Sequence, residues 1–322
     1  MTLDINYNIT NPRKVDQILE SAIEDLQATA SSDSLLKKFR PVGFNYYSLV
    51  SEIIYGVGNL STIRPAQLQY IKDTGANLVR VAFGVYDGPS LLSRVHNTAE
   101  MPLGVNDSNL RPTFIAACDL AMDSLASYGL YCHVNIVWGQ DTVSGMFSET
   151  KANSVLPGAK TRDYTISMAE WICNRYKDHP AFGYLSIGNE YVTDEAAITA
   201  PTSAQLSEFF TAIVAAVKEI SAKILVTADI SSPPVNLTRT KPTVEQTIDK
   251  FRALYKGLDF YCLHMYNDDY SFTGHQSAEA VSVAQNVIYS PLGYEGVESL
   301  MQAYKDMAVA DNKALIIGEF GI

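Results

Sequence analysis

Short apolar stretches alternate with longer amphipathic stretches from about residue 40 to the end of the chain. The apolar stretches are mostly continuous instead of alternating with polar residues, which is typical of parallel strands covered on both faces. The pattern predicts seven strands, at residues 42–47, 78–83, 130–137, 182–187, 224–228, 260–264 and 314–317.

Helical periodicity occupies the segments between these strands. Pro112 begins one such segment and Gly129 follows its end, as expected for a helix start and stop. Ser203 is the expected N-cap of another helix, whose apolar residues recur at helical spacing. The predicted helices cover residues 65–74, 112–128, 164–177, about 203–220, 244–255 and 297–309.

Repeated strand–helix units predict an α/β fold with a parallel sheet, either doubly wound or closed as a barrel. The first strand is followed by no glycine-rich phosphate fingerprint, which argues against a dinucleotide-binding fold. Polar and aromatic residues instead gather at the carboxyl ends of the strands, where barrel active sites lie. We therefore predict a TIM-type (β/α)8 barrel. These strand-end residues are Asn45, Arg80, Trp138, Asn189, Glu190, Asp229, His264, Tyr266 and Glu319.

The predicted barrel has seven strands where a complete one has eight. Residues 1–38 are helical in pattern and are expected to form an N-terminal extension. Residues 39–322 are expected to form the barrel domain, apparently truncated after the seventh strand and lacking the last βα unit. Because an open barrel leaves two unpaired strand edges, we interpret the sequence as a fragment or a truncated chain.

Composition narrows the classes of partner. A net charge of −11 over 322 residues disfavours nucleic acid, and no apolar run is long enough to span a bilayer. The N-terminus lacks the features of a signal peptide, so an intracellular location is the default unless the N-terminus was trimmed. The four cysteines show no metal-ligand spacing and are expected to be buried free thiols. We expect no metal or organic cofactor.

Two glutamates at strand ends carry the candidate chemistry. Glu190 ends the fourth strand in Leu-Ser-Ile-Gly-Asn-Glu, and Glu319 ends the seventh in Ile-Ile-Gly-Glu-Phe-Gly. Cleavage of a glycosidic bond needs two such carboxyl groups, one to protonate the leaving oxygen and one to attack the sugar or activate water. Taken alone, Asn189 and Glu190 are equally well explained as a cap and first turn of the next helix.

Other strand-end residues can support this pair. Arg80 is the expected cation that keeps Glu319 ionised, a role that hardly differs from a structural ion pair. Asn189 is placed to hydrogen-bond a sugar hydroxyl, and Tyr266 to donate its hydroxyl to Glu319. His264 is as plausibly a satisfied core histidine as a site residue.

The order of these motifs resembles glycoside hydrolase clan A, the retaining (β/α)8-barrel glycosidases, most nearly the cellulase-type family five. The resemblance spans residues 39–322 and implies that Glu319 is the nucleophile and Glu190 the acid and then the base. It also implies that Arg80, Asn189, His264 and Tyr266 serve the substrate site. The matching segments are Gly43-Phe-Asn-Tyr-Tyr, Asn77-Leu-Val-Arg80, Gly-Asn-Glu190, His264-x-Tyr266 and Gly-Glu319-Phe-Gly.

Two features depart from the family pattern. Val137 takes the place of the usual histidine near the end of strand three, and His133 falls deeper in that strand. Asn135 or Trp138 is a possible substitute. The family's sugar-stacking tryptophan follows strand eight, which the sequence does not supply. We expect Asn45 and Trp138 to contribute to substrate binding.

The sequence thus predicts retaining hydrolysis of a β-linked glycan or glycoside by double displacement, with the two carboxyl groups about 5 Å apart. The alternative is a non-catalytic carbohydrate-binding or scaffolding barrel. Aldolase-like barrel chemistry is disfavoured because no strand end offers a lysine. The sugar and linkage depend on loops without a readable code.

Overall fold

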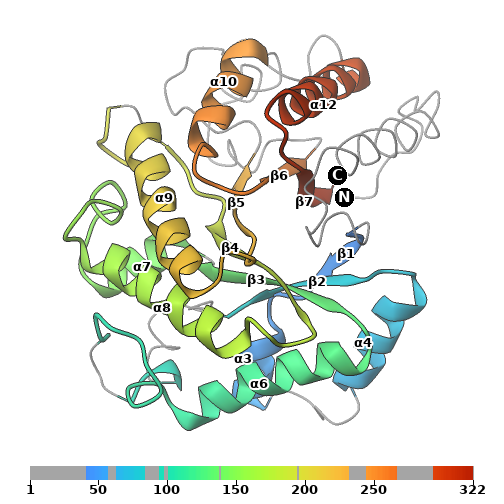
Figure 1. Ribbon diagram of the computed structural model, residues 1–322, viewed down its shortest axis with the longest axis vertical. Helices are drawn as coiled ribbons and strands as arrows, with labels where there is room; N and C mark the ends of the chain where they lie inside the picture. Colours follow the sequence, from blue (N-terminus) through green and yellow to red (C-terminus); the bar gives the residue numbers. More distant parts are fainter. Residues whose placement is uncertain are drawn as a thin grey trace.

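The computed structural model describes residues 41–56, 63–83, 94–97, 101–137, 139–193, 196–231, 244–266 and 293–321. Within this part of the chain, seven parallel strands follow one another in sequence order across a single sheet. The sheet curls into a nearly closed barrel with helices around its outside (Figure 1). This arrangement confirms the predicted (β/α)8-type fold without its eighth unit. The predicted helical extension at residues 1–38 lies outside the described residues.

All seven predicted strands are present. The first two end before the predicted boundary, whereas the last four extend beyond it. The extension matters because it brings Asn189 and Glu319 into β4 and β7. The strands are β1 (Gly43–Asn45), β2 (Leu78–Ala82), β3 (Tyr131–Val137), β4 (Phe182–Asn189), β5 (Val226–Ser231), β6 (Tyr261–Tyr266) and β7 (Leu315–Gly321).

The six predicted helices are also present, together with two others in the described part of the chain that the periodicity did not reveal. The additional helices, α3 and α7, have seven residues each, which is too short for a clear amphipathic pattern. The helices are α3 (Leu49–Tyr55), α4 (Ile63–Asp73), α6 (Pro112–Ser127), α7 (Gln140–Met146), α8 (Lys160–Tyr176), α9 (Ser203–Ile220), α10 (Val244–Leu254) and α12 (Gly293–Ala310).

The predicted cap of α9 is wrong by one residue. Thr202, not Ser203, is the N-cap: its hydroxyl accepts a hydrogen bond from the Gln205 backbone N–H at 3.2 Å. The Gln205 side chain in turn accepts from the Thr202 backbone N–H at 2.8 Å. These two reciprocal hydrogen bonds form a capping box. Its sequence signature is Thr-Ser-Ala-Gln, in which the glutamine comes three residues after the capping threonine.

The inside of the barrel is apolar at one level and polar at the next. Leu78, Tyr184, Phe260 and Cys262 form a small buried cluster. Because successive side chains of a strand point to opposite faces, Arg80 shares the face of Leu78, two residues further along β2. Arg80, His133, Asp229 and His264 are all buried and form a layer of ionisable side chains towards the carboxyl ends of the strands.

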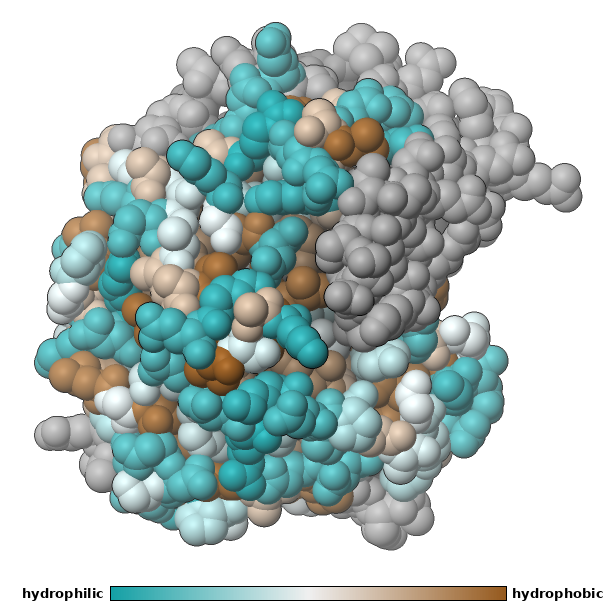
Figure 2. Space-filling view, in the orientation of Figure 1, coloured by the Kyte–Doolittle hydropathy of each residue, from teal (hydrophilic) through white to brown (hydrophobic). Residues whose placement is uncertain are grey.

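The opposite faces of the strands pack against the helices in a much larger apolar cluster. All four cysteines are buried and free, as predicted. On the face drawn in Figure 2, hydrophilic residues predominate among the described helices, interrupted by smaller hydrophobic areas. None of the helices in the described residues has the length and apolar character needed to cross a membrane.

We predict that Thr202→Ala lowers the free energy of unfolding by about 1 kcal/mol, because the Gln205 backbone N–H in the first turn of α9 loses its partner. Urea denaturation followed by circular dichroism measures the change. Ser203→Ala is the matched control and is expected to cost less, since Ser203 lies inside the helix. A larger loss in Ser203→Ala than in Thr202→Ala would contradict the assigned cap.

Candidate active site

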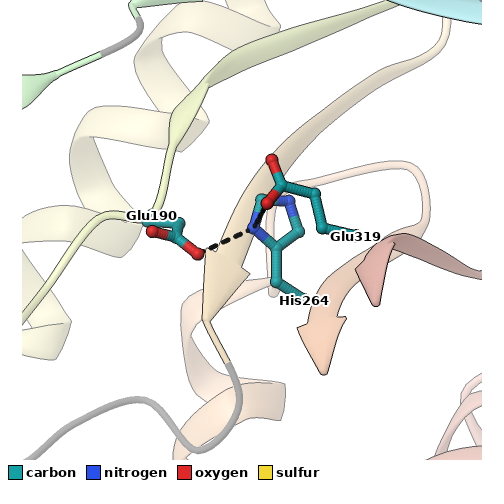
Figure 3. Close-up of side chains that lie close together, drawn as sticks. All are labelled: Glu190, His264 and Glu319. Carbon is teal, nitrogen blue, oxygen red and sulfur yellow. Dashed lines mark hydrogen bonds and ion pairs between the residues drawn. The ribbon is translucent and has the colours of Figure 1, made fainter. Parts of the chain in front are cut away.

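Two glutamates and a histidine from three strands meet at the carboxyl ends of the strands. His264 Nδ1 lies 3.0 Å from Glu190 Oε1 and 3.6 Å from Glu319 Oε2. Figure 3 shows both carboxyl groups directed towards this ring nitrogen. One carboxyl oxygen of each glutamate and the histidine nitrogen all lie within 4.8 Å of one another. The predicted pair is therefore brought together at the carboxyl ends of the strands.

A β-bulge directs Glu319 into the barrel. In the β6–β7 register Leu263 pairs with Ile317 and His264 pairs with Glu319, so Gly318 is an extra residue. Simple alternation from Ile317 would place Glu319 on the helix-covered face. The extra residue reverses this and places Glu319 on the face of His264, as bulges near active sites commonly do.

Gly318 can occupy this bulge only because it has no side chain. A Cβ atom there would lie 2.8 Å from Cys262 Sγ and 3.1 Å from two atoms of the His264 ring. The His264 side chain is wholly buried, so its ring has little room to retreat. The glycine of the Gly-Glu-Phe-Gly motif therefore fixes both the histidine and the glutamate.

A second irregularity precedes Glu190. In the β4–β5 register Ser186 pairs with Thr227 and Asn189 pairs with Asp229, so β4 has one residue more than β5 over this interval. Glu190 then leaves the strand with φ of 50°, in the left-handed region that non-glycine residues rarely adopt. Its backbone N–H donates to the Asp229 carbonyl oxygen at 2.8 Å, which holds the turn.

Arg80 on β2 contacts the ends of four other strands. Its Nε donates to Asp229 Oδ2 at 2.9 Å and its Nη2 to Asn189 Oδ1 at 2.6 Å, while Nη1 donates to Glu319 Oε1. Nη1 also approaches Asn45 Oδ1 at 3.5 Å. Burial disfavours its charge, but the carboxylates of Asp229 and Glu319 outweigh this effect and raise the pKa of Arg80 above its ordinary value.

Asp229 is the polar residue whose importance the sequence analysis missed. Its side chain is fully buried, and its Oδ2 also accepts a hydrogen bond from Asn135 Nδ2 at 3.0 Å and lies 3.2 Å from His133 Nε2. Burial opposes its ionisation, yet Arg80 and then His133 hold the pKa of Asp229 well below its usual range. An acid inside the apolar run of β5 was the available signal, because such a residue is costly unless it is paired.

The other predicted site residues have different outcomes. Asn45, Arg80, Asn189 and His264 lie with the two glutamates. Trp138 and the side chain of Tyr266 lie outside the described residues, so their roles stay predictions. Asn135 is fully buried and donates to Asp229 Oδ2, so it belongs to the polar layer of the barrel, and its role as a substitute for the family's strand-three histidine stays a prediction.

The chain matches the family model of cellulase, glycosyl hydrolase family 5, over residues 40–322. The chain belongs to glycosyl hydrolase family 5. This family 5 chain is therefore a glycosidase or endo-glycanase with a carbohydrate substrate. Comparison with curated protein sequences gives no match.

Solved structures confirm the fold of this family 5 hydrolase. A glycoside hydrolase family 5 mannosidase from Rhizomucor miehei, crystallised as a variant with mannosyl-fructose, superposes with a TM-score of 0.56 at 16% identity. The match covers 87% of this chain and 68% of the mannosidase. A structure described as a glycoside hydrolase has a TM-score of 0.52 at 14% identity, covering 88% and 79% of the two chains.

Glu190, His264 and Glu319 of this family 5 hydrolase are also the described residues most suited to hold a metal ion, since each offers one ligand atom. Their proximity is already explained without one. His264 Nδ1 and Glu190 are within hydrogen-bond distance, and Arg80 compensates the charge of Glu319.

A hollow of about 610 Å³ beside the site, between β1 and α4, is lined by Asn45 and Phe44 among others.

We predict that Gly318→Ala lowers the free energy of unfolding by about 1–3 kcal/mol, because the new methyl group collides with Cys262 and the His264 ring. Gly145→Ala is the matched control, since a Cβ atom there meets nothing within 4 Å. Urea denaturation of both variants checks this. Equal stability of the two variants would contradict the tight packing around Gly318.

Proposed function

We propose that the chain is a retaining glycoside hydrolase that cleaves a β-linked glycan or glycoside through a covalent glycosyl-enzyme. The observation that carries the proposal is the short distance, within 4.8 Å, between oxygen atoms of Glu190 and Glu319. Retaining enzymes have carboxyl groups about 5–5.5 Å apart, whereas inverting enzymes leave about 6.5–9.5 Å for a water molecule. An upper limit of 4.8 Å between one oxygen of each carboxyl group supports the retaining arrangement over the inverting one.

Glu319 is the proposed nucleophile. Its contact with Arg80 favours the ionised carboxylate, which can attack the anomeric carbon. The bond from the anomeric carbon to the leaving oxygen breaks as the bond to Glu319 forms, and Glu190 gives its proton to the leaving oxygen. The first product departs with that proton, and the sugar stays attached to Glu319 as an ester.

Glu190 is the proposed acid in the first step and the base in the second. Its side chain is 33% exposed, against 12% for Glu319, so it has better access to water. As a carboxylate it takes a proton from water, and the resulting hydroxide oxygen attacks the anomeric carbon from the side that the leaving group vacated. Glu319 departs as a carboxylate, and the two inversions restore the original configuration.

Asn189 and His264 are proposed to orient these groups. Asn189 Oδ1 is engaged by Arg80, which fixes the amide so that its Nδ2 remains to donate to a sugar hydroxyl. His264 Nδ1 lies within hydrogen-bond distance of Glu190 and holds that carboxyl near the scissile bond whichever partner carries the proton. Tyr266 is proposed to donate its hydroxyl to Glu319, and Asn45 and Trp138 to bind substrate.

We predict that Glu319→Ala lowers kcat on aryl β-glycosides by about 10³-fold or more, because no covalent intermediate can form. Glu190→Ala should lose about 10²–10⁴-fold on poor leaving groups. It should still release a burst of phenol from dinitrophenyl glycosides, which need little help from an acid. A panel of aryl glycosides and stopped-flow measurement of phenol release test these expectations.

Glu208→Ala is the matched control, since Glu208 in the first half of α9 pairs with Arg162 of α8 and its removal should leave kcat unchanged. Proton NMR of the first-formed product anomer tests retention directly. Formation of the opposite anomer would exclude the double displacement. Saturable glycan binding without turnover, insensitive to Glu190→Ala and Glu319→Ala, would instead support a non-catalytic binding barrel.

A further inference from the structure

We propose that Asp229 is a positioning residue of the reaction, which fixes the guanidinium of Arg80 and limits how strongly that cation acts on Glu319. The proposal rests on the proposed function, because it concerns the state of the nucleophile. It goes beyond the motifs that identified the site, since Asp229 belongs to none of them and makes no described contact with either glutamate side chain.

The geometry of Arg80 depends on Asp229. Nε and Nη2 of Arg80 both lie against Asp229 Oδ2, at 2.9 and 2.7 Å. This two-nitrogen contact fixes the plane of the guanidinium, because the guanidinium is rigid and flat. The remaining nitrogen, Nη1, then faces Glu319. Without Asp229, the guanidinium would lose these two contacts, and the direction of Nη1 would be less firmly fixed.

Asp229 is itself held by two residues of β3. Asn135 Nδ2 donates to Oδ2 at 3.0 Å, and His133 Nε2 lies 3.2 Å from the same atom. The His133 Nδ1 atom in turn lies 3.2 Å from the Tyr184 hydroxyl. Burial lowers the pKa of His133, although the neighbouring Asp229 opposes this. The result is a chain of contacts from the apolar floor of the barrel, through Asp229 and Arg80, to Glu319.

The charges within this layer explain why Asp229 affects the nucleophile. Arg80 faces two carboxylates at once, one fully buried and one 12% exposed. At low effective dielectric constant a neighbouring negative charge weakens the field that a cation exerts on a second anion. Asp229 therefore keeps Glu319 a reactive carboxylate instead of one firmly neutralised by Arg80. Among the described residues, the titratable or charged groups that act on Asp229 are Arg80 on β2, His133 on β3, Tyr184 on β4, Tyr255 after α10, and Cys262 and His264 on β6. Glu190 donates its backbone N–H to the Asp229 carbonyl oxygen, and Glu319 contacts the same guanidinium as Asp229.

The test compares two substitutions that are expected to move the titration of Glu319 in opposite directions. Asp229→Asn keeps the shape but removes the negative charge, so Arg80 acts fully on Glu319. The carboxyl titration of Glu319 should move about one pH unit lower. Asn135→Ala removes a hydrogen-bond donor to Asp229, so the Asp229 carboxylate interacts more strongly with Arg80. Arg80 then stabilises the Glu319 carboxylate less, and the titration of Glu319 should move about half a pH unit higher.

The first readout needs no substrate. Carbon-13 NMR of protein labelled at the glutamate carboxyl carbons follows the titration, and Glu319→Gln assigns the signal. The second readout is the acid limb of the pH profile of kcat/KM on an aryl β-glycoside, which should shift in the same directions. In Asp229→Asn, kcat should also fall by about tenfold, because a more strongly neutralised carboxylate is a weaker nucleophile.

Asp311→Asn is the control for charge removal. Asp311 accepts from Arg252 Nε at 2.7 Å and precedes the amino end of β7, whereas Glu319 lies near the carboxyl end of that strand, so its loss should leave both readouts unchanged. If Asp229→Asn fails to fold, Asn135→Ala decides, because it keeps the ion pair. Unshifted titrations in the folded variants would overturn the proposal and leave Asp229 a structural residue. An inactive wild-type protein with the predicted NMR shifts would refute the proposed function and not this inference.

Discussion

The candidate site depends on a buried guanidinium shared between a structural and a candidate catalytic carboxylate. Arg80 is 2% exposed, and a cation at that depth is stable only when it is paired and hydrogen-bonded. Asp229, Asn189 and Glu319 meet that demand from three other strands. The same contacts that make the buried charge tolerable also bring the ends of β2, β4, β5 and β7 together. Stability and chemistry are therefore coupled at this one side chain.

Two irregular strands place the carboxyl groups that this cation organises. A regular β7 would direct Glu319 to the helix-covered face, and a regular β4 would shift Asn189 relative to Asp229. The glycine before each acidic motif accommodates the change. Gly318 lies against the His264 ring, and a Cβ atom at Gly188 would lie 2.4 Å from the Tyr191 ring. Each motif thus carries both a carboxylate and the backbone feature that aims it.

The order of strands and the meeting of Glu190, Glu319 and Arg80 were predictable from the sequence, because buried parallel strands are continuous apolar runs and their carboxyl ends share one edge of the barrel. The bulges were not predictable, because register depends on pairing with a neighbouring strand. Asp229 was visible only as one strand-end acid among several, since its three partners, Arg80, His133 and Asn135, come from β2 and β3. Short helices such as α3 gave no periodic signal, because seven residues are too few for an amphipathic pattern to repeat.

The surroundings of the two glutamates differ in a way that supports their proposed division of labour. Glu319 lies deeper and touches a permanent cation, an environment that favours a charged nucleophile. Glu190 is more exposed and contacts His264, a group that can exchange a proton, at a strand end where φ is 50°. Two chemically identical side chains acquire separate functions when their environments favour different protonation states. Here the difference arises in the buried layer, where Asp229 determines how much of the charge of Arg80 is left for Glu319.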